Sequence, residues 1–449
     1  MSLRVSPSEP LPQAEGRRPD MAPDSTARCA LNVGIVNAFG ANRGDEAMLR
    51  ALVHFLRDSF TGVEITIYAK GQFDFSPEQL HVVDWPHADV PGRRWSYRLG
   101  RAAEKWLLAK PSRLPPRTTG LMEHDFILSA PAGPYFGDLN RRSNFAALLP
   151  LAVAQTRGIP FGIVGTSAGP FSNERWNRHR RTVLSHAQFW SIREPISMSH
   201  VESLDLGIDV VSAADLVFGH PARALEDLAD SGDANLHRER EHFEQLAKSG
   251  PIIAVTLNKT GYLKSDGSKE IFDADEYVLR ARRLLGHVLT KTGGHVVLFP
   301  HFYGEDRTEQ RLLTAVSTHL ARDKGRVSVL HPYLNCEAQQ ALYGLADFAV
   351  SHRYHPTIFA INAGCPFLCI RHQFKTDGML GLFDDPGPVV RTDDTTGRWI
   401  EAFDEAWMNR ESIRTQLCDR LPHVQRLSQA NYDAVTTHLQ RCPGNRCPG

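Results

Sequence analysis

The sequence predicts an α/β protein with two Rossmann-like domains that face each other across a cleft. Short apolar runs alternate with amphipathic stretches from Leu31 onward, a pattern typical of parallel α/β structure and not of a sandwich or a helical bundle. A strongly polar stretch at residues 220–249 separates two such series. The chain has 449 residues, which is enough for two domains that each bury a core.

Composition limits the classes of function. Hydrophobic residues make up 42% and charged residues 23% of the chain, close to the globular average, so global disorder is excluded. The 51 Lys and Arg balance the 51 Asp and Glu, so no overall field attracts nucleic acid or an anionic membrane, and an anion site must be local. No apolar run reaches the roughly 18 residues that span a bilayer, and no signal peptide is recognised, which favours a cytoplasmic protein.

The first domain is expected at residues 29–219, after a flexible leader at 1–28 that lacks hydrophobic periodicity. Its candidate strands are Leu31–Val36, Val63–Tyr68, Phe126–Ser129, Phe161–Gly165, Phe189–Ile192 and Val210–Ser212. Between the first two strands, the stretch 45–57 predicts a helix. Its apolar residues at helical spacing are Met48, Leu52, Phe55 and Leu56.

The second domain, at residues 250–395, repeats this architecture after the polar linker at 220–249. Its candidate strands are Ile252–Leu257, His295–Phe299, Val327–Leu330, Phe348–Ser351 and Phe367–Ile370. Residues 396–440 predict two helices that pack across both domains, and 441–449 predict a flexible tail. Ligands of such sheets bind beyond the carboxyl ends of the strands, so we look for site residues there.

The most informative stretch follows the strand that ends at Ser351. Pro356 suits the first position of a helix, so the turn before it ends at a helix N-terminus, which favours anions. Arg353 and His355 are two residues apart and would point to the same side of an extended turn. Arginine offers a planar fork for carboxylate or phosphate, and histidine can donate a proton near neutral pH. These two are the candidate catalytic residues; a capping and surface-charge role is the alternative.

Further cations follow other strands. Arg193 comes directly after an apolar strand, where it can reach the cleft or instead form a salt bridge with Glu194 or another surface acid. Lys375 follows another strand together with Arg371 and His372, so a basic cluster is expected there, although each of these can also be a solvated loop charge.

The loop that contains Asn42 joins the first strand to the first helix, and its glycines match neither dinucleotide nor P-loop spacing. Asp45 and Glu46 at the helix start would repel a phosphate, so we expect this loop to bind something neutral, such as sugar hydroxyls. A capped structural turn is the alternative. Asp138, in another strand-end loop, could be a general base or a cap.

One serine motif points to a different chemistry. Gly165-x-Ser167-x-Gly169 formally matches the nucleophile elbow of α/β hydrolases and follows a strand. An elbow requires a helix directly after the serine, whereas Gly169-Pro170 favours a turn first, so a loop that lets a ligand approach the backbone is preferred. No ligand spacing for a metal emerges from the sequence, and assistance by a divalent metal stays open.

Several motifs, taken in order over residues 31–385, resemble those of the polysaccharide pyruvyl transferase family. They are Asn42-x-Gly44-Asp45-Glu46, Gly165-x-Ser167-x-Gly169-Pro170-Phe171, Ile192-Arg193-Glu194-x-x-Ser197, and Ser351-x-Arg353-x-His355 with Gly364-x-Pro366 and Lys375. Two stretches depart from the family pattern. The family's run of glycines is here Ala130-Pro131-Ala132-Gly133, and the stretch His372-Gln373-Phe374 lacks the tyrosine that often precedes the lysine.

The resemblance implies a GT-B-like fold and a pyruvyl transferase with phosphoenolpyruvate as co-substrate. The acceptor would be a saccharide or lipid-linked saccharide of a cell-surface or exported polysaccharide, and the product a pyruvyl ketal. Such an acceptor would suit peripheral association with polysaccharide assembly machinery. The resemblance also implies that Arg353, His355 and Arg193 bind the donor. In our hypothesis His355 protonates the donor methylene while the arginines hold its carboxylate and phosphate.

Two other functions fit the same fold. A GT-B glycosyltransferase that uses a nucleotide sugar would need a base pocket and a ribose-binding acid, and no clear acid follows Ile370. A non-catalytic subunit of polysaccharide assembly would tolerate loss of the acid–base histidine, whereas Arg353 and His355 are both present.

Overall fold

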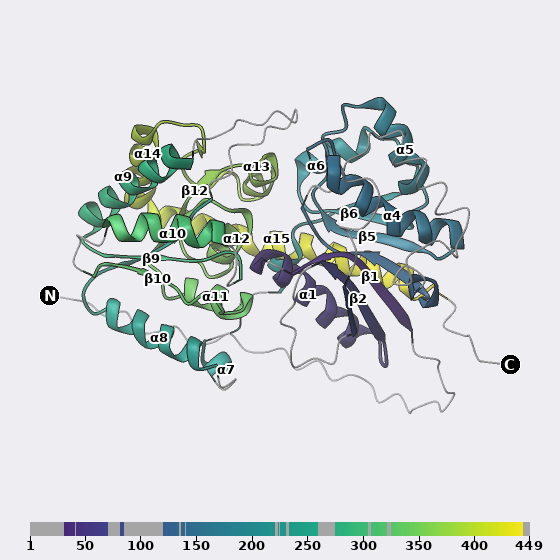
Figure 1. The fold of residues 1–449 in the computed structure, drawn as a ribbon, viewed down its shortest axis with the longest axis horizontal. Coiled ribbons are helices and arrows are strands. Elements are labelled where there is room, and N and C mark those ends of the chain that lie inside the picture. Colours follow the sequence, from purple (N-terminus) through teal and green to yellow (C-terminus); the bar gives the residue numbers. More distant parts are fainter. Residues whose placement is uncertain are drawn as a thin grey trace.

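The computed structural model describes residues 31–40, 42–70, 81–84, 120–133, 136–139, 141–220, 223, 225–229, 233–258, 274–303, 307–320 and 325–442. Within them the chain forms two parallel sheets with helices packed around each (Figure 1). The expected leader at 1–28 and the part of the tail from 443 onward lie outside the described residues.

The first sheet has seven parallel strands in the order β3-β2-β1-β4-β5-β6-β7. They are β1 (Asn32–Phe39), β2 (Glu64–Lys70), β3 (His81–Asp84), β4 (Phe126–Ser129), β5 (Phe161–Thr166), β6 (Phe189–Ile192) and β7 (Asp209–Ser212). The helical elements are α1 (Arg43–Ser59), η2 (Gly120–Glu123), α4 (Arg141–Arg157), α5 (Glu174–Leu184), α6 (Pro195–Glu202) and η3 (Leu216–Gly219). This strand order is Rossmann-like, with the switch point between β1 and β4.

The second sheet has six parallel strands in the order β10-β9-β8-β11-β12-β13. They are β8 (Ile252–Thr256), β9 (His295–Leu298), β10 (Val327–Val329), β11 (Phe348–Ser351), β12 (Phe367–Arg371) and β13 (Val390–Arg391). Its helices are α9 (Ala274–Thr292), α10 (Arg307–Leu320), α11 (Cys336–Tyr343), α12 (Tyr354–Asn362) and α13 (Phe374–Gly381). The α/β architecture with two Rossmann-like sheets is therefore confirmed.

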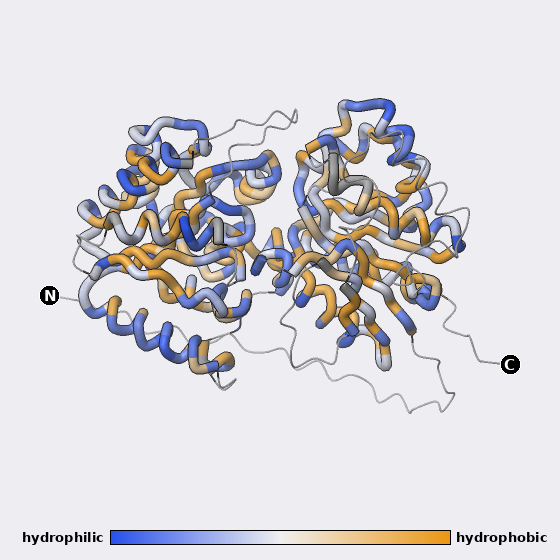
Figure 2. The backbone as a smooth tube through the Cα atoms, in the orientation of Figure 1, coloured by the Kyte–Doolittle hydropathy of each residue, from blue (hydrophilic) through white to orange (hydrophobic). Residues whose placement is uncertain are grey.

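The apolar runs in the sequence locate eleven of these strands, with ends that differ by a few residues at most. Strands β5, β8, β11 and β12 are buried along their whole length, because helices cover a parallel sheet on both faces. Figure 2 shows apolar residues concentrated in the two sheets. The prediction missed β3 and β13, which are both short strands at the edge of a sheet. β3 has only two apolar residues, and β13 has only two residues in all. No helix in the described parts of the chain is long and apolar enough to cross a membrane.

The segment 220–249 is not a linker where the structure describes it. It forms α7 (Leu225–Ala229) and α8 (Ala234–Leu246). Phe243 of α8 is buried in the core of the second domain, with its ring edge-on to that of Phe299 at a centroid distance of 6.1 Å. Several charged residues of α8, among them Arg238, Glu241 and Glu244, are exposed, because a surface helix needs only one apolar stripe.

The last two helices connect the domains. α14 (Thr396–Met408) packs on α9 and β12 of the second domain. α15 (Arg410–Leu439) then crosses to the first domain, where it contacts η3, β5, β6 and β7 (Figure 1, yellow). On α15, Ser428 donates to the backbone oxygen of Asp215 at 2.9 Å, and Asn431 donates to that of Ala214 at 2.8 Å. Hydrogen bonds from α15 therefore position the segment that follows β7, residues 214 and 215.

Arg43, at the start of α1, joins the first domain to the second. It is fully buried, and its side chain donates to four backbone oxygens of the second domain at 2.7–3.0 Å. The acceptors are those of Pro300, Phe302, Pro332 and Leu334. A guanidinium can bind several carbonyls at once because its donors are arranged in a planar fork. The first turn of α1 is thereby fixed to the second sheet.

Replacing Arg43 by alanine is expected to lower the free energy of unfolding by at least about 3 kcal/mol, because each hydrogen bond from a charged donor contributes about 1.5–3 kcal/mol and buried carbonyls lose their partner. Urea denaturation followed by circular dichroism measures the effect. The control is Arg178→Ala, since Arg178 is 78% exposed and 3.9 Å from Glu174, and a change within about 0.5 kcal/mol is expected there. Equal stability of the two variants would contradict the role of Arg43.

Candidate active site

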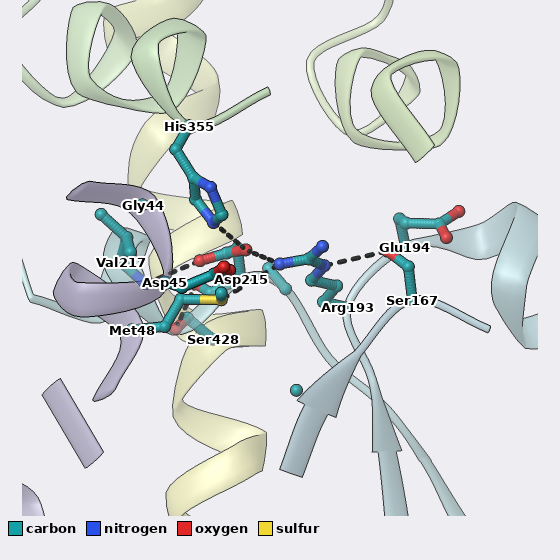
Figure 3. A network of polar contacts seen from close by, with 12 residues as sticks. Gly44, Asp45, Met48, Ser167, Arg193, Glu194, Asp215, Val217, His355 and Ser428 are labelled. Carbon is teal, nitrogen blue, oxygen red and sulfur yellow. Dashed lines mark hydrogen bonds and ion pairs between the residues drawn. The ribbon is translucent and has the colours of Figure 1, made fainter. Parts of the chain in front are cut away.

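Arg193 lies directly after β6, at the carboxyl edge of the first sheet, and is fully buried (Figure 3). Its Nε donates to Ser167 Oγ at 2.9 Å and its Nη1 to Asp215 Oδ2 at 2.8 Å. Nη2 has no hydrogen-bond partner among the described residues. A buried donor of this kind is costly unless something accepts from it, so Arg193 can bind an anionic group.

The salt bridge that the sequence suggested between Arg193 and Glu194 does not form. Glu194 instead accepts from the backbone nitrogen of Ser197 at 3.0 Å and caps α6. Burial raises the pKa of Glu194 to about 7, although hydrogen bonds from Ser197 oppose the shift.

Asp215 is the carboxylate that lies between Arg193 and His355. It follows β7, is fully buried, and also accepts from the backbone nitrogen of Val217 at 3.0 Å. Burial alone would raise its pKa, but Arg193 and His355 lower the pKa to about 2, so Asp215 is ionised. Its Oδ2 lies 3.7 Å from Nε2 of His355, which is longer than a hydrogen bond but close enough for an ion pair with a protonated ring.

His355 extends from α12 of the second domain toward the first domain (Figure 3). Its ring packs against the backbone of α1 at Gly44, where a Cβ would overlap the imidazole. Burial lowers the pKa of His355, and Asp215 opposes this shift. Nε2 has no hydrogen-bond partner within the described part of the chain. The ring is therefore neutral near pH 7 and can gain a proton with Asp215 beside it.

The helix of His355 begins earlier than the sequence suggested. α12 starts at Tyr354, so Pro356 is its third residue and not its first, and His355 is helical. Only Arg353 has the extended conformation, at the N-cap. The prediction that Arg353 and His355 share an extended turn is therefore wrong, because only Arg353 precedes the helix.

Gly44→Ala is expected to displace the His355 ring and to abolish most activity of this site, while the protein stays folded, because alanine is favoured over glycine in a helix. Activity and thermal denaturation, measured on the same preparation, separate the two effects. Gly286→Ala in α9 is the matched control, because its Cβ would meet only Leu320 at 3.9 Å. Full activity of Gly44→Ala would show that the contact has no role.

Lys375, near the start of α13, lies close to Arg193. Its Nζ lies 5.2 Å from the centre of the Tyr354 ring, the same ring that Arg193 covers at 4.5 Å. Burial lowers the pKa of Lys375 to about 7, and the charge of Arg193 contributes to the shift. The amine can therefore change its charge near neutral pH.

Arg353 and His301 lie on the second-domain side of the site. Arg353 donates to the backbone oxygen of Leu257 at 3.2 Å and to Glu309 at 3.3 Å. Burial holds the pKa of His301 well below its usual value, and the charges of Arg353, Arg43 and Lys375 lower it further. Cationic groups from both domains thus converge around one buried, neutral histidine.

Several buried polar atoms around this point lack a partner among the described residues. They are Arg193 Nη2, His301 Nδ1, His355 Nε2, His372 Nδ1 and Thr376 Oγ1. Nearly all buried polar groups in proteins are hydrogen-bonded, so a cluster of exceptions indicates the place of a polar ligand. With the nearby arginines and lysine, the arrangement suits a small molecule that carries more than one negative charge.

The model of the family described as polysaccharide pyruvyl transferase matches residues 42–373. The chain belongs to the polysaccharide pyruvyl transferase family. It is 23% identical over 360 residues to the amylovoran biosynthesis protein AmsJ of Erwinia amylovora, an alignment that covers 76% of this chain and 82% of that protein. Membership identifies a transferase that acts on polysaccharide.

Solved structures share the GT-B-like fold of this chain. UDP-GlcNAc 2-epimerase from Neisseria meningitidis, bound to UDP-GlcNAc, has a TM-score of 0.57 at 14% identity and covers 92% of this chain and all of its own. A glycosyltransferase from Siraitia grosvenorii in complex with UDP has a TM-score of 0.56 at 11% identity, with 92% of this chain covered and 100% of that chain. At such identities the likeness describes the fold alone.

The structure gives the predicted acceptor residues different roles. Asn42 caps α1 and donates to Asp45 at 2.6 Å, and Asp45 lies near Asp215 and Arg193 (Figure 3). Glu46 is buried and binds Arg50 at 2.8 Å and the hydroxyl of Tyr303. Its oxygens are thus used within the protein, whereas Asp45 remains beside the site.

Asp138 takes part in contacts within the first domain. Its Oδ1 binds Arg180 at 2.8 Å, and its Oδ2 accepts from the backbone nitrogens of Ser172 and Asn173 before α5. It does not cap α5, because the N-cap of that helix is Asn173. Ser167 is likewise buried and accepts from Arg193, and α5 does not begin until Glu174, so the residues form no nucleophile elbow.

Sequence reasoning missed Asp215 and the function of Gly44. Asp215 follows the carboxyl end of β7, next to β6 in the sheet, so its position after a strand was a usable signal. The sequence around Gly44 gave no signal, because the need for glycine at this position arises from contact with a histidine 311 residues later in the chain.

Proposed function

We propose that this protein transfers a pyruvyl group from phosphoenolpyruvate to a sugar of an exported polysaccharide or of its lipid-linked precursor, and forms a ketal. The observation that carries this proposal is a pair of buried nitrogens, Arg193 Nη2 and His355 Nε2, which lie on either side of Asp215 and have no hydrogen-bond partner among the residues that the structure describes. One is a fixed cation and the other can hold a mobile proton. A donor with two anionic groups and a double bond to protonate requires both.

The proposed reaction balances without an oxidant or a metal in the equation. A proton adds to the methylene carbon of phosphoenolpyruvate, and one sugar hydroxyl attacks the central carbon. The bond from that carbon to the phosphate oxygen then breaks, and a second hydroxyl of the sugar closes the ketal. Of the two hydroxyl protons, one ends in the new methyl group and the other on the released phosphate.

Each residue has a distinct part in this proposal. Arg193 and Arg353 bind the carboxylate and the phosphate of the donor, and Lys375 stabilises the phosphate as it leaves. His355 delivers the proton to the methylene carbon, with Asp215 stabilising its protonated ring. A trianionic donor would itself raise the pKa of His355 and favour the protonated form.

The acceptor is proposed to approach from α1. Asp45 lies half-buried at its first turn, and its carboxylate acts on Arg193, His355 and Lys375. A carboxylate there can orient sugar hydroxyls and accept a proton from one of them. The similarity to AmsJ, an amylovoran biosynthesis protein, supports an exopolysaccharide acceptor. Because phosphoenolpyruvate is an intracellular metabolite, the proposed reaction takes place in the cytoplasm, with peripheral association with assembly machinery.

Isothermal titration with phosphoenolpyruvate, and separately with UDP- and GDP-sugars, tests the donor. We expect phosphoenolpyruvate to bind the native chain and to lose its binding in Arg353→Ala, while the exposed Arg398→Ala binds normally. Sugars that are then supplied as acceptors should gain the mass of pyruvic acid less one water. Binding of a nucleotide sugar in place of phosphoenolpyruvate would refute the proposal in favour of a glycosyltransferase.

Donor binding should weaken as the pH rises above 7. The pKa of Lys375 in the free protein is about 7, below its usual value, so the amine is charged below pH 7 and neutral above it. An anionic donor binds the charged form, so its Kd should rise up to about tenfold per pH unit from pH 7 until the pKa of the complex is reached.

Titrations between pH 7 and 9 measure this dependence, a range in which the donor phosphate, with a second pKa of about 6, is fully ionised. The control is Lys375→Arg, because arginine stays charged throughout and should give a nearly constant Kd. The same slope in both proteins would assign the dependence to another group.

A further inference from the structure

A second cluster of chemically active side chains lies where the two domains meet, away from the donor site. His54 belongs to α1, His220 follows η3, and Glu337 is the second residue of α11. One ligand atom from each of these residues lies within 4.8 Å of the other two. His54 is ten residues beyond Gly44, so it lies about 15 Å along the helix from the His355 contact.

The three side chains face one another. The rings of His54 and His220 have centroids 5.2 Å apart, and His220 Nε2 lies 4.0 Å from Glu337 Oε1. All three are half-buried and accessible from solvent.

The surroundings leave room for a hydrated ion. His54 and His220 line a cavity of about 430 Å³, and His220 and Glu337 line a smaller adjoining hollow. Arg50 lines the hollow with Glu337, but its Nε donates to Glu46 at 2.8 Å. A water or two could complete the coordination from the cavity side.

We propose that His54, His220 and Glu337 bind a divalent transition-metal ion, Zn²⁺ in particular, that links the first domain to the second. Two imidazoles and one carboxylate form a known zinc ligand set, with further positions open to water. Imidazole ligands disfavour Mg²⁺ and Ca²⁺, which prefer oxygen. The ion would link the C-terminal half of α1 to α11, just as Arg43 links the first turn of α1 to the second domain.

This site has no part in the proposed reaction. The ligands come from both domains, so the ion binds the assembled arrangement and not the unfolded chain. Zn²⁺ should therefore raise the melting temperature of the full-length protein in a concentration-dependent way.

The test uses the full-length protein after chelator treatment, titrated with Zn²⁺ by calorimetry and with Co²⁺ by visible absorption. We expect one ion per chain, a higher melting temperature, and d–d bands without the thiolate charge-transfer band that a cysteine ligand would give. His54→Gln and Glu337→Gln should each weaken binding by about 100-fold or more, since even outer partners of metal ligands contribute 10–100-fold.

His237→Gln is the matched control, because His237 is an exposed histidine 3.3 Å from Glu241 and should leave binding unchanged. The melting temperatures of all variants without metal establish that they are folded. Unaltered affinity in both His54→Gln and Glu337→Gln, a thiolate band, or no binding at millimolar Zn²⁺ would each overturn the proposal. A metal-induced rise in melting temperature that persists in Glu337→Gln would overturn the link between domains.

Discussion

His355→Gln is expected to lower kcat by about 10²–10⁴-fold, the usual contribution of a positioned general acid, while donor affinity changes far less. Glutamine fills a similar space and can hydrogen-bond, but it cannot deliver a proton to carbon. Phosphate release from phosphoenolpyruvate in the presence of the acceptor measures kcat, and titration with the donor alone measures affinity. The two readouts together separate proton delivery from binding.

The control for this substitution is His423→Gln, an exposed histidine on α15 that should retain full turnover. Asp215→Asn gives an independent check, because removal of the charge should lower the pKa of His355 and shift the pH profile of kcat. Normal turnover in His355→Gln at saturating donor would refute the acid role and leave the binding role of Arg193 untouched.

Arg193→Met should weaken phosphoenolpyruvate binding by about 2–5 kcal/mol, or roughly 30- to 5,000-fold in Kd, since it removes a desolvated charge partner of the donor. It should also lower the free energy of unfolding by about 3–5 kcal/mol, because Asp215 is left buried without its cation. Calorimetric titration and urea denaturation measure the two losses.

A double variant separates these effects. Arg193→Met with Asp215→Asn removes both members of the buried pair, so most of the lost stability should return, as no uncompensated charge remains. Donor binding should not return, because the anion site is still missing. If binding recovered together with stability, Arg193 would be a structural residue only.

The class of fold and the position of several candidate site residues follow from the sequence. Continuous apolar runs of this length, bounded by turn residues, favour buried strands of a parallel sheet, and their predicted ends place Arg193, Arg353 and Lys375 after strands, as the structure does. The prediction of a linker at 220–249 was wrong, because a low apolar content does not distinguish a linker from a surface helix such as α8. His355 was recognised as a residue type but not as part of a helix.

The contacts of these residues follow only from the tertiary structure. The pairing of Arg193 with Asp215, the need for glycine at Gly44 and the insertion of Arg43 all arise from contacts between segments far apart in the chain. So does the meeting of His54, His220 and Glu337. Local sequence patterns reflect burial and the periodicity of helices and strands, which depend on neighbouring residues. The partners of a side chain and the shift of its pKa depend on which faces of the two domains pack together and exclude water. No local pattern encodes that packing.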